Sequence, residues 1–107
     1  MKKKLTTEED YRLRVDRVCM YIREHLDKEI DMRRLAVLSA FSPFHFHRIM
    51  RAYLKEPIGA FIIRTRVETA AKLLRYTDLP VADIAYRVGY DTPSSLTKSF
   101  CKLFGIS

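Results

Sequence analysis

Apolar residues recur at helical spacing along almost the whole chain. In the segment from about residue 7 to residue 27 they occupy every third or fourth position, at Tyr11, Val15, Val18, Ile22 and Leu26. This spacing gathers the side chains on one face of a helix with about 3.6 residues per turn, whereas no window alternates with the period of two that is typical of a β-strand. The pattern therefore predicts an all-α fold.

Capping residues indicate where the helices begin. Thr6 and Glu9 have the spacing of a capping box before the first helix, and Asp31 can cap a short second helix that stops near residue 40. Ser42-Pro43 and Thr92-Pro93 each place an N-cap candidate before a proline at the first helical position. We therefore expect these two pairs to begin a third and a sixth helix.

Two more helices are expected between these. A long fourth helix covers about residues 58–75, and a fifth runs from Pro80 to a glycine stop at Gly89. From the second helix onward, the positions that we expect to face the interior are apolar and follow helical spacing: Met32, Leu35, Ala36, Leu38, Phe46, Ile49, Met50, Tyr53, Phe61, Ile62, Val67, Ala70, Ala71, Leu74, Val81, Ile84, Ala85, Val88, Leu96, Phe100, Leu103 and Phe104.

The chain contains an internal repeat. Leu35-Ala36 recurs 49 positions later as Ile84-Ala85, and Ala40-Phe41 recurs as Gly89-Tyr90 at the same offset. In each copy a short helix leads through a small residue to an aromatic residue, expected to fill the core, and then to a capped second helix. This order is the plan of a helix-turn-helix unit. The repeat predicts two helix-turn-helix subdomains, residues 5–56 and 77–107, joined by a linker helix over residues 57–76.

The second helix of each repeat is basic and contains no acid. The net charge of the chain is +7, and the second helices contribute Arg48, Arg51, Lys55, Lys98 and Lys102 but neither Asp nor Glu. A solvated helix usually mixes both signs, because opposite charges one turn apart stabilise it. Two acid-free helices in a basic chain therefore indicate an anionic partner.

Helical periodicity assigns these charges to outward faces. Opposite the apolar stripes lie Phe44, His47, Arg48, Arg51 and Lys55 on the third helix, and Ser94, Lys98 and Cys101, flanked by Ser95 and Lys102, on the sixth. In the major groove of DNA, arginine and lysine read guanine, serine and histidine read several bases, and an aromatic ring can contact a thymine methyl group. The expected function is therefore sequence-specific binding of double-stranded DNA by two recognition helices in successive major grooves.

Four segments carry a family resemblance: Leu35-Ala36 through Ser42-Pro43 to Arg48; Gly59, Phe61 and Arg66 leading to the segment 70–74; Ile84-Ala85 to Tyr90; and Ser94-Ser95 to Ser107. Together they resemble the DNA-binding domain of the AraC/XylS family of bacterial transcription regulators, over about residues 10–107. The resemblance implies seven helices in two subdomains joined by a long central helix. RNA polymerase is expected as a further partner. A cytoplasmic location is expected because the basic N-terminus is not followed by the apolar stretch of a secretory signal.

The resemblance assigns roles to matching positions. It implies base reading by residues of both second helices: Phe44, His47, Arg48, Pro93, Ser94, Ser95 and Lys98. Contacts to the DNA backbone are expected from residues beside them: Ser42, Arg51, Lys55, Thr92, Thr97 and Lys102. Because Pro93 and Ser94 carry no charge, the second unit is expected to read DNA more weakly than the first.

The two ends of the chain carry two further expectations. Family members continue past Ile106-Ser107 with a proline and a short last helix, so we expect this chain to be a fragment cut at the end of its second unit. Because the first helix begins close to Met1, an effector-sensing domain is expected to follow on the C-terminal side.

A helical protein-interaction module with a basic surface is the alternative function. No enzyme is expected, because no pair of carboxylates accompanies a histidine or cysteine nucleophile. His45 and His47 are two positions apart and diverge on a helix, so no metal site is expected, and Cys19 and Cys101 are read as reduced thiols. We expect no cofactor. No contact with a membrane is expected either, since the chain lacks a run of about 18 apolar residues.

Overall fold

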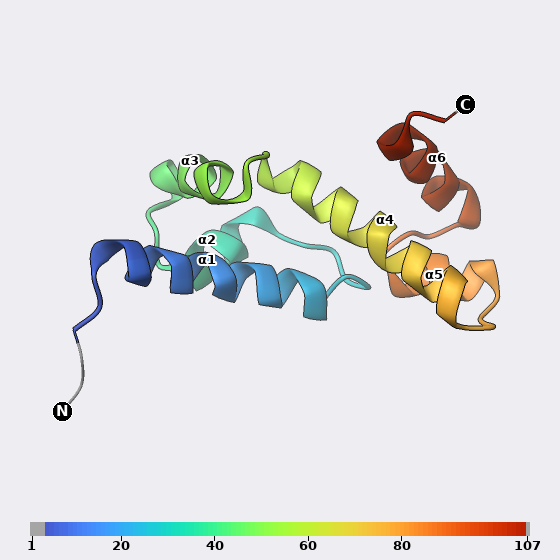
Figure 1. Cartoon of the computed structure of the whole chain (residues 1–107), viewed down its shortest axis with the longest axis horizontal. Helices are drawn as coiled ribbons and strands as arrows, with labels where there is room; N and C mark the ends of the chain where they lie inside the picture. Colours follow the sequence, from blue (N-terminus) through green and yellow to red (C-terminus); the bar gives the residue numbers. More distant parts are fainter. Residues whose placement is uncertain (1–3, 107) are drawn as a thin grey trace. The chain divides into compact units, whose positions relative to one another are not determined.

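The computed structural model describes residues 4–106, which form helices connected by short loops (Figure 1). The helices are α1 (Thr7–Glu24), α2 (Met32–Ser39), α3 (Pro43–Leu54), α4 (Ile58–Tyr76), α5 (Val81–Arg87) and α6 (Pro93–Phe104). Residues 4–106 contain no strand, which confirms the predicted all-α fold. Within the same range, no helix is both long enough and apolar enough to cross a lipid bilayer.

Side-chain caps fix the starts of the helices as the sequence predicts. Before α1, the amide of Glu9 donates to Oγ1 of Thr6 (3.1 Å) and the amide of Thr6 donates to Oε1 of Glu9 (3.2 Å). This reciprocal pair is a capping box, and the hydrogen bond from the Thr6 amide lowers the pKa of the Glu9 carboxyl. Asp31, Ser42 and Thr92 likewise accept backbone amides at the starts of α2, α3 and α6.

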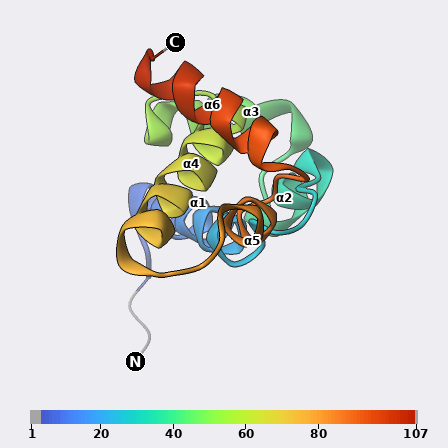
Figure 2. The same cartoon turned by 90° about the vertical axis from the view of Figure 1, so that its right-hand side faces the viewer.

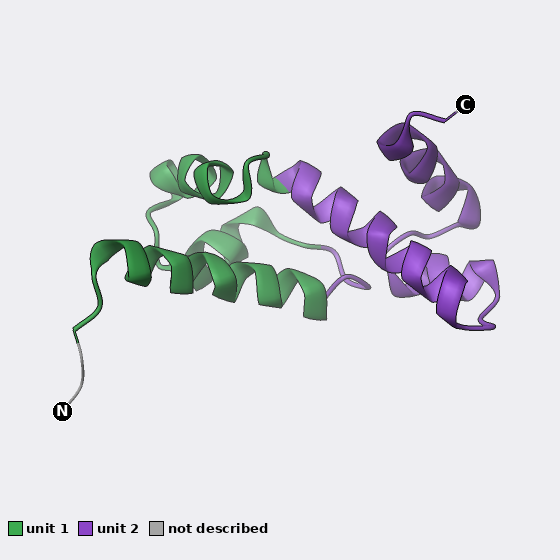
Figure 3. Cartoon of the chain, in the orientation of Figure 1, with its two compact units in different colours: residues 1–24, 30–58 green, residues 25–29, 59–107 purple. Residues whose placement is uncertain are grey.

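The chain divides into two compact units (Figure 3). One consists of Met1–Glu24 and Ile30–Ile58, and the other of His25–Glu29 and Gly59–Ser107. Nearly all of α4 therefore groups with the second unit, in which its Ala70 joins the core. The predicted subdomain limits, with residues 57–76 as a separate linker, stay a prediction.

The first unit packs α1, α2 and α3 around one apolar core. Most of the positions expected inside it are buried: Val15, Val18, Ile22, Leu35, Ala36, Phe46 and Met50. Five others are half-buried at its edge: Tyr11, Met32, Leu38, Ile49 and Tyr53. Helix α1 ends at Glu24, three residues before the expected limit, because His25–Glu29 leaves the helix and belongs to the other unit.

Arg14 of α1 holds the turn between α2 and α3. Its guanidinium donates from Nε to the carbonyl of Ser39 (2.7 Å), from a terminal nitrogen to the carbonyl of Ala40, and from Nη1 to Asp10 (3.2 Å). The same group lies 3.9 Å from the ring centre of Phe41. Phe41 is buried in the core, as expected for the aromatic residue after the turn. Sequence reasoning missed Arg14, because nothing in the local pattern relates α1 to a turn 25 residues away.

The second unit packs α4, α5 and α6 around a smaller core. Its buried residues are Ala70, Ile84, Ala85, Val88 and Leu96, with Leu73, Leu79 and Tyr90 packed against them. Figure 2 shows α5 nearly end-on and α6 from the side, so the two helices of the second helix-turn-helix are steeply inclined to each other. All five buried residues were among the positions predicted to face inward.

Gly89 lets a distant loop approach the turn after α5. The backbone of Gly89 has φ +98°, and a Cβ atom added there would lie 2.2 Å from the carbonyl oxygen of Leu26. Arg66 of α4 donates to the carbonyl of Lys28 in the same loop (3.1 Å). The glycine stop is therefore confirmed, and a second reason for glycine appears, namely the close approach of the 25–29 segment.

Four positions predicted to be buried are exposed instead: Leu74 (46%), Val81 (47%), Leu103 (37%) and Phe104 (52%). Ala71 and Phe100 are only partly buried. The exposed residues lie in the last turns of α4 and α6 and the first turn of α5, beyond the core that is centred on Ile84. Helical spacing identifies the apolar side of a helix, but it does not show how far the neighbouring helix extends along that side.

Candidate DNA-binding interface

Helix α3 exposes every residue that the sequence assigned to DNA contact in the first unit. Phe44, His47 and Arg48 are exposed, and Phe44 is 88% accessible to solvent. The expected backbone contacts Ser42, Arg51 and Lys55 are exposed as well. Phe46 and Met50, on the opposite side of α3, are fully buried. The core thus fixes the rotation of α3 and turns its basic side outward.

The cap of α3 also engages a neighbouring histidine. Oγ of Ser42 accepts the amide of His45 (3.3 Å) and lies 2.9 Å from Nδ1 of the His45 ring. Because a hydroxyl can donate or accept, Ser42 engages Nδ1 of His45 in either tautomer of the ring. Nε2, on the other side of the ring, is the nitrogen left for an external hydrogen-bond partner at the start of α3.

Helix α6 exposes the corresponding set in the second unit: Thr92, Pro93, Ser94, Ser95, Thr97, Lys98 and Lys102. Several of their hydroxyls are already engaged. Thr92 Oγ1 accepts the amide of Ser95 and donates to its Oγ, each at 3.1 Å, and Thr97 Oγ1 donates to the carbonyl of Pro93 (2.9 Å). Within residues 4–106, Lys98 forms no hydrogen bond or ion pair, so its ammonium group is free for an external partner.

The positive charge on the two helices is not neutralised within the described chain. Elsewhere an arginine pairs with an acid one turn away, as Arg64 does with Glu68 at 3.1 Å. Neither Arg48 nor Arg51 forms such a pair with any residue in the range 4–106. Both exposed faces therefore present uncompensated positive charge beside hydrogen-bonding and apolar groups. This combination suits the phosphates and base edges of DNA.

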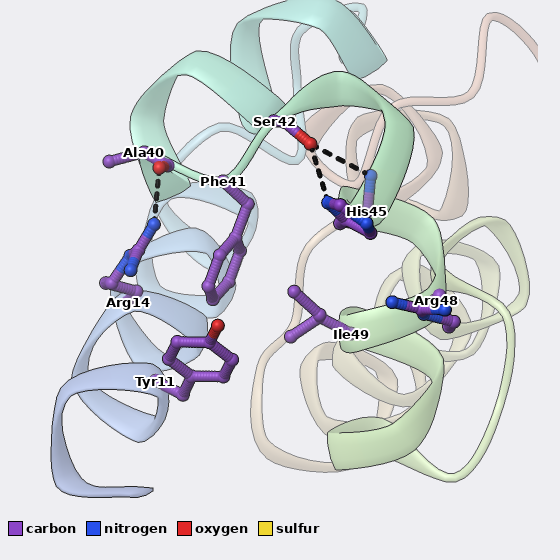
Figure 4. A pocket seen from close by; sticks show the side chains of 8 residues that line it. All are labelled: Tyr11, Arg14, Ala40, Phe41, Ser42, His45, Arg48 and Ile49. Carbon is purple, nitrogen blue, oxygen red and sulfur yellow. Dashed lines mark hydrogen bonds between the residues drawn. The ribbon is translucent and has the colours of Figure 1, made fainter. Parts of the chain in front are cut away.

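A depression of about 380 Å³ lies beside α3 in the first unit (Figure 4). It is lined by residues of α1, the α2–α3 turn and the first half of α3: Tyr11, Arg14, Ala40, Phe41, Ser42, His45, Arg48 and Ile49. Sequence reasoning did not find this depression, because it joins the start of α1 to residues about 30 positions later. Arg48 belongs both to the depression and to the predicted reading face.

Two helix-turn-helix units with basic outward helices define a helix-turn-helix DNA-binding protein. Residues 35–107 match the family model described as "Helix-turn-helix domain". The chain belongs to the AraC/XylS-type helix-turn-helix DNA-binding domains of bacterial transcription regulators. This confirms the predicted family and fold class, and with them sequence-specific DNA binding as its function. The family is one of DNA-binding regulators rather than enzymes, as expected.

Curated relatives agree with this membership. The chain is 31% identical over 93 residues to the HTH-type transcriptional activator AarP of Providencia stuartii, and the match covers 87% of this chain and 69% of AarP. It is also 31% identical over 94 residues to the uncharacterized HTH-type transcriptional regulator YbfP of Bacillus subtilis. That match covers 88% of this chain but only 32% of YbfP, so the chain spans about a third of this relative's length.

A solved structure supports the fold. The DNA-binding domain of AdpA, a global transcriptional factor crystallised in complex with a target DNA, superimposes with a TM-score of 0.77. The match has 29% sequence identity and covers 87% of this chain and 84% of that structure. The arrangement of helices in this chain is therefore one that a DNA-bound protein also adopts.

Proposed function

We propose that α3 and α6 are the two recognition helices and that they enter successive major grooves of one DNA duplex. The observation that carries this proposal is the common orientation of the two helices within their units. Each packs its apolar side against the core of its unit, through Phe46 and Met50 on α3 and Leu96 on α6. Each also exposes all of its predicted DNA-contacting residues and contains no acid. The two helices therefore present similar basic surfaces, as binding to two successive major grooves of one duplex requires.

The side chains on α3 have distinct roles in this proposal. Arg48 donates to the edge of a guanine, His47 hydrogen-bonds to a neighbouring base, and Phe44 contacts a thymine methyl group. Ser42, Arg51 and Lys55 contact phosphates on either side and hold the helix in register.

The side chains on α6 act in the same way, with fewer charges. Lys98 is the cationic base-reading group, beside Pro93, Ser94 and Ser95, and the phosphate contacts come from Thr92, Thr97 and Lys102. The Ser95 hydroxyl accepts a hydrogen bond from Thr92, and Lys98 is the one charged side chain among the proposed base-reading residues of this helix. We therefore propose that the second unit binds more weakly and extends the site recognised by the first.

The other partners are proposed for the regulator to which this domain belongs. The chain spans about a third of the length of YbfP, so a sensing domain in the same polypeptide is consistent with this relative. We propose that this sensing domain responds to an effector and that the DNA-bound regulator contacts RNA polymerase. We also propose that the protein acts in the bacterial cytoplasm. The alternative, a helical protein-interaction module, would need no preference for one DNA sequence.

Selection from a random duplex pool tests this function directly. The chain should enrich one sequence family, and its affinity should fall steeply with salt. Arg48→Ala should then cost about 1–3 kcal/mol on the selected duplex and much less on a scrambled one. Lys72→Ala removes the same charge from the exposed side of α4 and serves as the matched control.

The outcomes separate the two functions. A pool that stays random after selection would reject specific binding and favour the interaction module. If specific binding holds but Arg48→Ala weakens the selected and the scrambled duplex equally, Arg48 contacts only phosphate.

A further inference from the structure

The depression beside α3 presents hydrogen-bond donors that the assigned DNA contacts do not use. Within residues 4–106, no hydrogen bond is found for the hydroxyl of Tyr11, and Figure 4 shows this hydroxyl pointing toward the space between Phe41 and Ile49. His45 lines the same space, and its Nδ1 lies 2.9 Å from Oγ of Ser42, which leaves Nε2 as the ring nitrogen for an external partner. A tyrosine hydroxyl and an imidazole from different helices therefore line one depression.

The surrounding charges favour an anion there. Arg14 and Arg48 both line the depression. The nearby carboxylate of Asp10 is paired with Arg14 at 3.2 Å, so its charge is compensated. All three nitrogens of the Arg14 guanidinium already donate to protein atoms, which holds this cation in place. An entering anion thus meets a fixed positive charge and two side chains that can donate hydrogen bonds to it.

The position of the depression on α3 indicates which anion this is. At about 100° per residue, His45 and Ile49 lie on the flank of α3, between the outward Arg48 and the buried Phe46. When a recognition helix enters the major groove, the two sugar-phosphate backbones run along its flanks. The flank that faces α1 therefore lies beside one backbone, and the depression opens there.

We propose that this depression binds one backbone phosphate of the duplex, with Tyr11 of α1 and His45 of α3 donating hydrogen bonds to its oxygens. This inference rests on the proposed entry of α3 into the major groove. It makes α1 part of the DNA interface, and it places a phosphate beside Arg48, the base-reading arginine. The phosphate contact adds affinity without reading sequence itself.

The test removes one hydroxyl. Tyr11→Phe keeps the ring that packs edge-on against Phe41 (4.9 Å between ring centres) but deletes the donor. Tyr76→Phe, at a tyrosine that is 74% exposed at the end of α4, is the matched control. Fluorescence anisotropy on the selected duplex should show about tenfold weaker binding for Tyr11→Phe, as expected for a hydrogen bond to a charged group, and no change for the control. Because phosphates are identical in all sequences, a scrambled duplex should show the same loss.

A series of duplexes locates the phosphate. Each carries one neutral methylphosphonate, and one position should abolish the difference between the wild-type chain and Tyr11→Phe. His45→Gln should also weaken binding to the unmodified duplex, and this difference from the wild-type chain should disappear when the same phosphate is replaced. The histidine variant provides a second test if Tyr11→Phe lowers the melting temperature.

Three results would overturn the proposal while leaving specific DNA binding intact. The first is equal affinity of Tyr11→Phe and the wild-type chain. The second is a loss that persists on every methylphosphonate duplex. The third is binding of inorganic phosphate in the depression while no methylphosphonate position changes the affinity for the duplex. That result would assign the depression to free anions.

Discussion

The two turns of the repeat offer opposite substitutions at one equivalent position. Gly89 has φ +98°, and an added Cβ would lie 2.2 Å from the backbone oxygen of Leu26 and 2.9 Å from Nε of Arg66. Ala40, its counterpart in the first unit, already carries a Cβ at φ 60°. We therefore predict that Gly89→Ala destabilises the fold, whereas Ala40→Gly stabilises it.

The structure gives the size of each effect. A side chain in the left-handed region costs about 1–2 kcal/mol, and forcing a methyl group against a packed backbone costs about 1–3 kcal/mol more. Gly89→Ala should therefore lower the free energy of unfolding by about 2–5 kcal/mol, because the contact is with backbone and cannot rotate away. Ala40→Gly relieves the first cost but loosens the unfolded chain, for a net gain of about 0.5–1 kcal/mol.

Thermal and urea unfolding, followed by circular dichroism, measure both changes. Gly89→Ala should lower the melting temperature by about 10 °C or more, and Ala40→Gly should raise it by a few degrees. An unchanged melting temperature for Gly89→Ala would refute the close approach of Leu26 to the turn. A loss of stability in Ala40→Gly would show that the left-handed alanine is not strained.

Two further predictions concern single side chains. Phe46→Ala should reduce the free energy of unfolding by about 3–5 kcal/mol, since Phe46 is fully buried. Phe100→Ala should reduce it by less, because Phe100 is only partly buried. Urea unfolding measures both changes, and equal losses would contradict the assigned burial. In the folded protein Cys101 should react with iodoacetamide faster than Cys19, which is buried and whose thiol pKa is raised by that burial. Peptide mass analysis at short times measures this, and equal labelling would place Cys19 at the surface.

Local signals were enough to predict the helices and their order. A cap followed by proline, as at Ser42 and Thr92, depends only on neighbouring residues, and both caps form as predicted. The buried sides of α3 and α6 were also predictable, because Phe46 and Leu96 stand in strong periodic patterns. Exposure of the basic faces followed from the same periodicity. Their contacts with DNA remain predictions.

Contacts between distant segments could not be predicted in this way. Arg14 and the turn it holds are 25 residues apart, and Arg66 donates to a loop 38 residues earlier. An arginine on an amphipathic helix has the same local pattern whether it faces solvent or a carbonyl group. The exposed Leu103 and Phe104 show the converse error, since periodicity marked them as apolar without showing what lies opposite.

The turn between the two helices of each helix-turn-helix unit is stabilised differently in the two copies. This difference explains why its small residue is Ala40 in the first unit and Gly89 in the second. After α2 the chain turns through Ala40, which is exposed, and Arg14 holds the carbonyls of Ser39 and Ala40 from one side. No backbone atom has to lie close to the Cβ of Ala40, so alanine is tolerated there and only its positive φ is unfavourable. After α5 the carbonyl of Leu26 occupies the position of a Cβ, and only glycine leaves room for it. The second unit therefore depends on a loop from outside its own helices, and substitutions in residues 25–29 should weaken α5 and α6 rather than α2 and α3.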